Sequence, residues 1–441
     1  MTKHRYLRGQ GTKMDDRERQ AFLERWFPLV RRLLAESLPI ASYSGQEQQQ
    51  AECLLRFFHE HGLMAALLPR GGVAALSRRL SAGESVSLET IRREVAQARQ
   101  RRQPVLAYNA HLDIVYPGET SAWTSSPFSY TERDGRIYGR GTCDMKGAMA
   151  CMAVALMAIA DHPRHPPTAP LVMGCFVTEE ECAEGLSFEE IISDLELVPD
   201  AVLLGEPSSL EIARGQRGKL EFRVETHGRL AHTSMPEVGK NAAYDLARVA
   251  LAIERLDHEE FARFGRDPAH LLDRNTLVLT AARSVPFQRN SVPAEAEGFV
   301  TVRLAKHGSF DQIMEKLRKA PGWPTDSRAS PLVYTTPSWT GRPSAWICEH
   351  PAWETESNHD FTDCLRRTCQ LVTGTIPCEK IWPFSTDGVT SAGRHGIPTL
   401  GFGPGIESVA HIVDEWVAVD HLETALLVYT TLPKHFSGVS A

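Results

Sequence analysis

Three adjacent glutamates, Glu179, Glu180 and Glu181, follow an apolar run that ends before Thr178. Adjacent carboxylates repel one another, so such a cluster is best tolerated where a cation neutralises part of its charge. Neighbouring residues of an extended segment point to opposite sides, so two adjacent glutamates would do different work. One can bind a metal ion while the other faces a substrate and moves protons. Taken alone, the three residues could equally be exposed acids of a loop.

Other side chains able to bind a metal are spread along the chain. His111 is followed by Asp113, and a nearby carboxylate commonly orients a metal-binding imidazole. Glu206 lies in the segment GEPSS, and His411 lies in SVAHIVDEW. Asp144 lies in GRGTCDMKGAMA, near the start of an expected helix, where an Asp by itself would be a helix cap. Two histidines together with these acids provide the types of ligand that can bind two divalent ions bridged by an aspartate.

The elements that would position these residues are buried strands. Four short apolar runs, each bounded by turn residues, predict strands at residues 104–110, 169–177, 200–205 and 397–403. Helical patterns cover residues 146–160 and 361–372. Strands that alternate with helices predict an α/β domain with a mostly parallel central sheet flanked by helices. Ligands of such sheets bind beyond the carboxyl ends of the strands, and each run is followed by one of the residues above. The sequence therefore predicts one site at that edge.

The middle of the chain has a different pattern. A strand, a helix, two strands, a helix and a last strand are predicted in that order, at residues 218–226, 240–256, 275–285, 297–304, 310–320 and 331–337. This order is typical of the split βαβ, or ferredoxin-like, α+β domain. We therefore expect a second domain at residues 213–338, inserted into a first domain made of residues 1–212 and 339–441.

Composition narrows the possible partners. The 441 residues carry a formal charge of -7, and 42% are hydrophobic, which is enough for two or three domains with sizeable cores. Mild acidity argues against a nucleic-acid partner, and the glycine spacing around Asp144 matches no phosphate-binding motif. No uninterrupted apolar stretch is long enough to span a bilayer, so no membrane partner is expected. Nine cysteines without a CxxC pair fit reduced thiols, and we expect a cytoplasmic protein.

Seven segments in this order resemble the M20 metallopeptidases: HLDIV, GRGTCDMKG, TEEE, GEPSS, THGRLAHTSMPEVGKNA, RNSVPAEAEGFVTVR and GFGPGIESVAHIVDE. That family includes acetylornithine deacetylase, succinyl-diaminopimelate desuccinylase, aminoacylase and the glutamate carboxypeptidases. The resemblance runs from about residue 20 to the C-terminus and is greatest to the YgeY-like branch, hydrolases linked to selenium metabolism. It implies a zinc-peptidase-like domain with an inserted lid and dimerisation domain.

The resemblance also implies roles for the residues at the ends of the strands. His111 and Glu206 would bind one metal ion, Glu180 and His411 the other, and Asp144 would bridge them. The ions would be Zn²⁺, with Co²⁺ or Mn²⁺ as alternatives. Asp113 would orient His111. Glu179 would then be the general base.

The triple glutamate leaves a second register open, in which Glu180 is the base and Glu181 the ligand. We favour the first register, because Gly185 then falls where the family has a glycine. In the lid, His232 would reach the site of the partner subunit of a homodimer. Asn290 and Arg303 match positions that contact substrate, and an Arg suits a carboxylate.

The expected function is two-metal hydrolysis of an amide bond, with an N-acyl amino acid or related small molecule as substrate. A dipeptidase or carboxypeptidase would need the same residues. A homologue that binds a metal or ligand without catalysis is the alternative from another class. It would be expected to lack part of the ligand set, and every ligand type is present.

Overall fold

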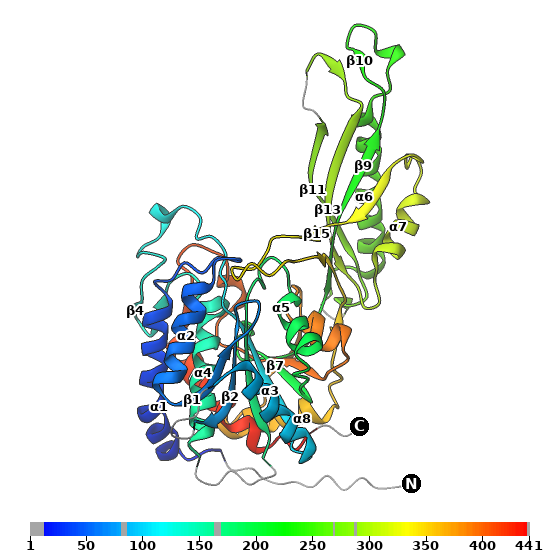
Figure 1. The fold of residues 1–441 in the computed structure, drawn as a ribbon. Coiled ribbons are helices and arrows are strands. Elements are labelled where there is room, and N and C mark those ends of the chain that lie inside the picture. Colours follow the sequence, from blue (N-terminus) through cyan, green and yellow to red (C-terminus); the bar gives the residue numbers. More distant parts are fainter. Residues whose placement is uncertain (1–12, 81–85, 163–168, 268–269, 286–288, 439–441) are drawn as a thin grey trace, which may run out of the picture.

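The computed structural model describes residues 13–80, 86–162, 169–267, 270–285 and 289–438. These residues form a large α/β body and a smaller, elongated domain that projects from it (Figure 1). We call the smaller domain the lid.

A mixed sheet forms the centre of the body. Its four middle strands are parallel neighbours in the order β6-β3-β7-β20, and they are the four strands predicted from apolar runs. Antiparallel strands extend the sheet on both sides. The strands in spatial order are β1 (Leu63–Leu67), β2 (Val73–Arg79), β6 (Leu171–Val177), β3 (Val105–His111), β7 (Ala201–Leu204), β20 (Thr399–Gly401), β8 (Ile212–Gln216) and β18 (Trp353–Glu354), with β19 (Glu379–Trp382) parallel to β8.

Helices cover both faces of this sheet (Figure 1). One face carries the larger apolar core, to which α1 (Asp16–Ser37), α2 (Gln48–Glu60), α4 (Gly147–Ala160), α8 (Asp360–Thr373) and α9 (Val419–Thr431) contribute. The other face packs against α3 (Leu88–Gln100) and α5 (Leu186–Glu189). The middle strands are therefore buried on both sides, which explains why their sequences are continuously apolar.

The central helix α4 is buried along almost its whole length. Every residue from Gly147 to Ile159 is buried, between the sheet and the helices α1 and α9. By length and composition alone, Thr142–Ala160 would be apolar enough to cross a membrane, but 89% of its most apolar window lies inside the protein. The helix is thus accounted for as a core element.

The lid has the predicted ferredoxin-like order. Its antiparallel sheet runs β11-β13-β9-β14, and the buried side packs against two helices through residues such as Phe222, Val249 and Val300. Alternate residues of β9 are buried, as expected for a sheet with one solvated face. The lid elements are β9 (Gly218–His227), α6 (Ala242–Phe264), β11 (Thr276–Val285), β13 (Glu295–Leu304), α7 (Phe310–Arg318), β14 (Arg328–Pro331) and β17 (Glu349–His350).

Small ribbons complete the fold. At the end of the lid far from the body, β10 (Ala231–His232) pairs with β12 (Ser291–Val292). Near the body, β15 (Val333–Tyr334) pairs with β16 (Trp346–Ile347). A three-stranded sheet on the body contains β21 (Trp416–Ala418), β5 (Arg136–Tyr138) and β4 (Thr131–Arg133).

Strand pairing shows where the chain passes between body and lid. It leaves the central sheet after Gln216 and enters the lid sheet at Gly218. It pairs with the lid for the last time at His350, and it rejoins the central sheet at Trp353. Both crossings lie later in the chain than the predicted boundaries after residues 212 and 338. The strands near the second crossing have only two residues each, too few to show a period in the sequence.

Candidate metal and catalytic site

The predicted metal-binding residues gather at the carboxyl ends of the parallel strands. His111 is the last residue of β3, the three glutamates follow β6, and Glu206 follows β7. Because β6, β3 and β7 are parallel neighbours, these ends lie at one edge of the sheet. Asp144 reaches the same place from the irregular turn before α4, and His411 from the loop after β20.

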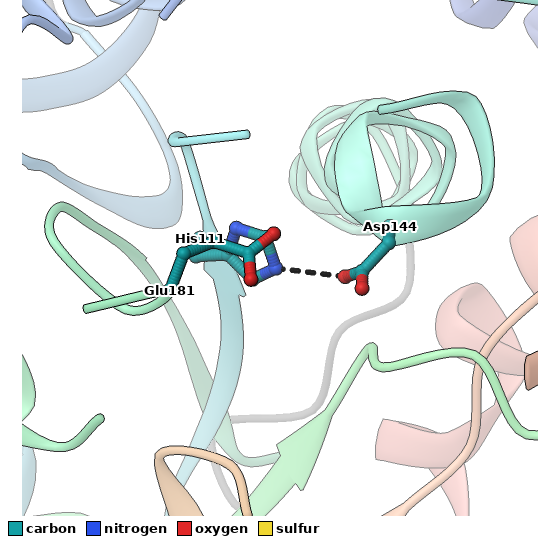
Figure 2. Close-up of side chains that lie close together, drawn as sticks. All are labelled: His111, Asp144 and Glu181. Carbon is teal, nitrogen blue, oxygen red and sulfur yellow. Dashed lines mark hydrogen bonds and ion pairs between the residues drawn. The ribbon is translucent and has the colours of Figure 1, made fainter. Parts of the chain in front are cut away.

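Asp144 lies between the two histidines. Its Oδ1 is 2.9 Å from His111 Nε2, and its Oδ2 is 3.1 Å from His411 Nε2. Glu181 Oε1 is 3.2 Å from the same His411 nitrogen. Figure 2 shows His111 and Glu181 converging on the Asp144 carboxylate. A carboxylate that presents one oxygen to each of two imidazoles has the arrangement of a bridging ligand.

A second group adjoins the first. Atoms of His111, Glu180 and Glu206 able to bind a metal lie within 4.8 Å of one another, and Glu206 Oε1 is 3.8 Å from His111 Nε2. Glu180 Oε1 is buried and has no hydrogen-bond partner among the described residues. Buried carboxylates that lie this close together are suited to binding divalent cations. A cation would neutralise their mutual repulsion and would bind the unpartnered Glu180 oxygen.

The pKa values reflect the same crowding of acids. Burial, followed by the charge of neighbouring carboxylates, raises the pKa of Glu180 and of Glu206 well above the ordinary range. Burial and the charge of Asp144 raise the pKa of Glu181 to about 7. Hydrogen bonds to Asp144 and Glu181 raise the pKa of His411 to about 10. The cluster therefore favours any form in which positive charge is added to it.

Asp113 holds several parts of the site together. His111 Nδ1 is 2.9 Å from the backbone oxygen of Asp113, which leaves His111 Nε2 as the atom that faces the cluster. The Asp113 carboxylate accepts backbone N–H bonds from Glu180 at 3.2 Å and from Glu181 at 3.0 Å, and the Ser44 hydroxyl at 2.7 Å. The Asp113 backbone oxygen thus fixes the His111 ring, and its carboxylate holds the first turn of the glutamate loop.

The three glutamates are not placed as our favoured register expects. Glu179 points away from the cluster, and its carboxylate accepts bonds from Arg70 Nε at 3.1 Å and the Tyr334 hydroxyl at 3.2 Å. Glu181, rather than Glu180, lies beside His411. The side chains do not alternate as in a strand because Glu179 has a left-handed φ of 62° and begins a turn. These contacts favour the second register.

A cavity of about 300 Å³ opens beside the cluster, between body and lid. Arg303 lines it from β13, and Lys219 lines it from β9 at the directly paired position. Arg303 Nη1 is buried without a hydrogen-bond partner in the described part of the chain. The full lining is Asp144, Glu180, Glu181, Glu184, Glu206, Pro207, Lys219, Arg303, Phe384, Ser385, Glu407, Ala410 and His411. Glu179 does not line it.

His232 and Asn290 lie elsewhere. His232 is on β10, at the far end of the lid from the body (Figure 1), where its Nδ1 is 2.7 Å from Ser234 Oγ. The backbone oxygen of Asn290 is 3.5 Å from Thr233 Oγ1 on the same ribbon pair. Both side chains are exposed. Neither residue can contact substrate in the cavity of its own subunit in this arrangement.

Sequence reasoning missed several residues that support the site. The buried Glu415 carboxylate accepts backbone N–H bonds from Cys143 at 2.7 Å and Asp144 at 3.0 Å, and thereby fixes the turn that carries Asp144. The buried Asp387 accepts bonds from the Asn109 amide and the Gly185 backbone. Glu415 lies in the segment GFGPGIESVAHIVDE and Asp387 in the segment STDGV, but nothing in a single sequence distinguishes such a buried acid from an exposed one.

Residues 107–435 match the peptidase family M20/M25/M40. The uncharacterised protein YgeY of Escherichia coli strain K12 is 32% identical over 330 residues, which cover 75% of this chain and 80% of YgeY. A succinyl-diaminopimelate desuccinylase of Methylorubrum extorquens is 31% identical over 346 residues, 74% of this chain and 81% of that protein. The crystal structure of the M20 family metallo-carboxypeptidase Sso-CP2 from Sulfolobus solfataricus has a TM-score of 0.66 at 17% identity, with 94% and 99% of the two chains covered.

Proposed function

Because the chain belongs to peptidase family M20/M25/M40 and is a hydrolase of amide or peptide bonds, we propose that it removes the acyl group from an N-acyl amino acid. Two divalent metal ions would assist the reaction. The observation that carries this proposal is the position of Asp144, which presents one carboxylate oxygen to His111 and the other to His411. The desuccinylase relative, which covers three quarters of the chain, supports a deacylase.

Two groups of side chains would hold the ions. His111 and Glu206 would bind one, Glu181 and His411 the other, and Asp144 both. Imidazoles mixed with carboxylates suit Zn²⁺, and Co²⁺ and Mn²⁺ accept the same ligands. When bound, two such ions supply a Lewis acid for the scissile carbonyl and make water more acidic.

Glu180 is our proposed general base. It lines the cavity, and its Oε1 has no hydrogen-bond partner among the residues described. We propose that this carboxylate takes a proton from the attacking water and passes it to the leaving nitrogen. The raised pKa of Glu180, due first to burial, suits a group that must hold the proton between the two steps.

Arg303 and Lys219 would bind the carboxylate of the substrate. They project into the cavity from paired positions on neighbouring strands, opposite the acidic cluster. Arg303 Nη1 has no hydrogen-bond partner among the described residues, so a bound carboxylate would satisfy it. Lys219, which is paired with Glu184 at 2.8 Å, would add positive charge beside it. The C-terminal carboxylate of a dipeptide would fit as well, so a dipeptidase or carboxypeptidase of the same family is the alternative.

A homodimer formed through the lid would bring His232 of one subunit to the cavity of the other subunit. The cavity of its own subunit is out of its reach. Large apolar side chains are exposed on the lid, on α6 at Tyr244 and Leu251 and on the edge strand β11 at Val278. Exposed apolar side chains on neighbouring elements are typical of an interface. We propose that these faces meet in the dimer and that His232 of the partner subunit helps to hold the reacting carbonyl.

The test is metal-dependent release of free amine. N-acetyl, N-succinyl, N-formyl and N-carbamoyl amino acids and D- and L-dipeptides would be incubated with the protein, after chelation and after Zn²⁺ or Co²⁺ is restored. We expect release from an N-acyl amino acid that returns with metal. Release from dipeptides alone would favour the alternative. No release together with no bound metal would favour a homologue without catalysis.

A further inference from the structure

A segment of the lid makes an excursion onto the body. Residues 332–348, which we call the strap, connect β14 to β17, and both of these strands pair with β9 of the lid. Figure 1 shows the strap, in yellow to gold around β15, crossing from the base of the lid over the body. Both ends of the strap are thus fixed in the lid sheet, so a rotation of the lid must move them.

The middle of the strap is bound to the body beside the turn between β1 and β2. Arg70 of that turn donates to the Pro343 oxygen at 3.2 Å and to Ser344 Oγ at 2.5 Å. A Cβ atom on the neighbouring Gly71 would lie 2.0 Å from Trp339 Nε1, so the strap lies directly against the turn. The same Arg70 donates through Nε to Glu179.

Glu179 contacts the strap and directly precedes Glu180 and Glu181 in the chain. One of its oxygens is bound by Arg70 of the body, and the other by Tyr334 at the start of the strap. The side chain is fully buried, and the backbone N–H donates to Glu47 at 2.9 Å. A buried carboxylate and a left-handed non-glycine residue both cost free energy, so the surrounding contacts must hold this conformation in place.

Glu179 begins the loop of residues 179–184, and the other end of this loop, at Glu184, is also held by the lid. Glu184 accepts from Lys219 of β9 at 2.8 Å, and its backbone oxygen accepts from Trp346 of β16 at 3.1 Å. Its second carboxylate oxygen lies 3.4 Å from His350 of β17. Residues 179–184, which include Glu180 and Glu181, are therefore fixed at both ends by groups that belong to the lid or its strap.

We propose that Glu179 is a positioning residue that, through Tyr334, ties the placement of Glu180 and Glu181 to the position of the lid. The inference rests on the proposed function, in which Glu180 moves the proton and Glu181 binds metal. Movement of the lid would carry the Tyr334 hydroxyl with it, and the turn at Glu179 would follow. The glutamates are then correctly placed only in the lid positions that keep this contact. Glu179 neither lines the cavity nor touches the reacting atoms.

Full-length variants loaded with Co²⁺ test this role. Glu179→Ala removes both contacts, Glu179→Gln keeps a group that can accept from Tyr334, and Tyr334→Phe removes only the hydroxyl. Tyr130→Phe is the matched control, since the Tyr130 hydroxyl also bonds a glutamate, Glu132, but on the body surface. The visible Co²⁺ spectrum and the Co²⁺ affinity measure changes at the metal site. The kcat and KM values are measured with the compound from which the wild type releases amine fastest.

We expect Glu179→Ala and Tyr334→Phe to change the Co²⁺ spectrum and to lower kcat by ~10- to 100-fold, because misplacement by about 1 Å has effects of this size. KM should stay within about threefold, since substrate contacts are unchanged. Glu179→Gln should lose less than Glu179→Ala, and Tyr130→Phe should match the wild type.

Two results would overturn the proposal. In the first, Glu179→Gln loses nearly all activity with an unchanged Co²⁺ spectrum, which would make Glu179 the proton acceptor. In the second, Tyr334→Phe matches Tyr130→Phe in spectrum and kcat. If the wild type releases amine from no compound, the proposed function fails by itself. The Co²⁺ spectra and affinities of Glu179→Ala and Tyr334→Phe would still decide whether Glu179 positions the metal-binding loop.

Discussion

One backbone angle decides which glutamate does which work. The φ of 62° at Glu179 turns the chain as soon as β6 ends, so Glu179 is carried to Arg70 while Glu181 reaches His411. Had the strand continued, Glu179 and Glu181 would share a side, and Glu180 would face the other way. A single sequence cannot show such an angle, because glutamate rarely adopts it.

The register can be tested by separating metal binding from catalysis. Glu181→Ala should lose metal, since it removes a carboxylate that lies beside His411 and Asp144. Glu180→Gln should keep two metal ions per chain while kcat falls by ~10²- to 10⁴-fold, the usual contribution of a general base. Metal content by elemental analysis and kcat on one substrate check both. Glu89→Gln, on the exposed surface, is the control. Full metal content in Glu181→Ala would contradict the assignment.

The paired cations of the cavity predict a preference for anionic substrates. Arg303→Met should lower kcat/KM for a substrate with a free carboxylate by about 10- to 100-fold, because hydrogen bonds to charged groups contribute ~1.5–3 kcal/mol. The corresponding amide should be much less affected. Arg223→Met is the matched control, because Arg223 lies further along β9, outside the cavity. Equal losses for acid and amide would show that Arg303 acts on folding rather than on the carboxylate.

At the scale of elements, burial decided what could be predicted. The strands β3, β6, β7 and β20 are buried on both faces, so their sequences are continuous apolar runs and were predicted. The alternating pattern of β9 and the helix α6 likewise indicated the lid. The strap has no such pattern, because its ribbon strands are two residues long and it is held by single side chains. Its contact with Glu179 therefore required the structure.

The edge strand and outer helix of the lid predict the dimer. The double variant Leu251→Glu and Val278→Lys places charges on exposed apolar positions of α6 and β11, and burying charges at an interface is costly. We expect the wild type to be a dimer, and the double variant to be a folded monomer with reduced activity. Light scattering and circular dichroism would measure mass and folding. The outer face of α3 provides the control, through the double variant Glu89→Lys and Arg93→Glu. A monomeric wild type with full activity would refute the proposed dimer.

At the scale of the whole molecule, β10 lies so far from the body that His232 is predicted to complete the site of the partner subunit rather than that of its own. His232→Ala and Glu180→Gln should each be nearly inactive alone. In a mixed dimer, the subunit with intact Glu180 would receive His232 from its Glu180→Gln partner, so activity should return when the two variants are unfolded together and refolded. Each variant refolded alone is the control. Activity no greater than the sum of those controls would exclude a shared site.

The charge of the cleft predicts how stability depends on pH and metal. The folded pKa values of Glu181, about 7, and His411, about 10, are both raised above the usual unfolded values of about 4.3 and 6.5. A raised pKa means that the folded state holds more protons than the unfolded state. Its contribution to stability is complete below the unfolded pKa, and it is lost as pH rises through the folded pKa. After chelation, the stability that these groups contribute should therefore fall between pH 6 and pH 8.

Bound metal should reverse this trend, because metal ligands must lose their protons and affinity rises with pH. At a fixed free Zn²⁺ concentration, the increase in Tm over the chelated protein should be larger at pH 8 than at pH 6, since stabilisation grows with the ratio of ligand to Kd. Thermal unfolding followed by circular dichroism measures both forms. Glu181→Gln cannot titrate at that position, so the Tm of its chelated form should fall less between pH 6 and pH 8 than that of the wild type. An increase in Tm that is equal at the two pH values would mean that the buried acids of the cleft do not bind the metal.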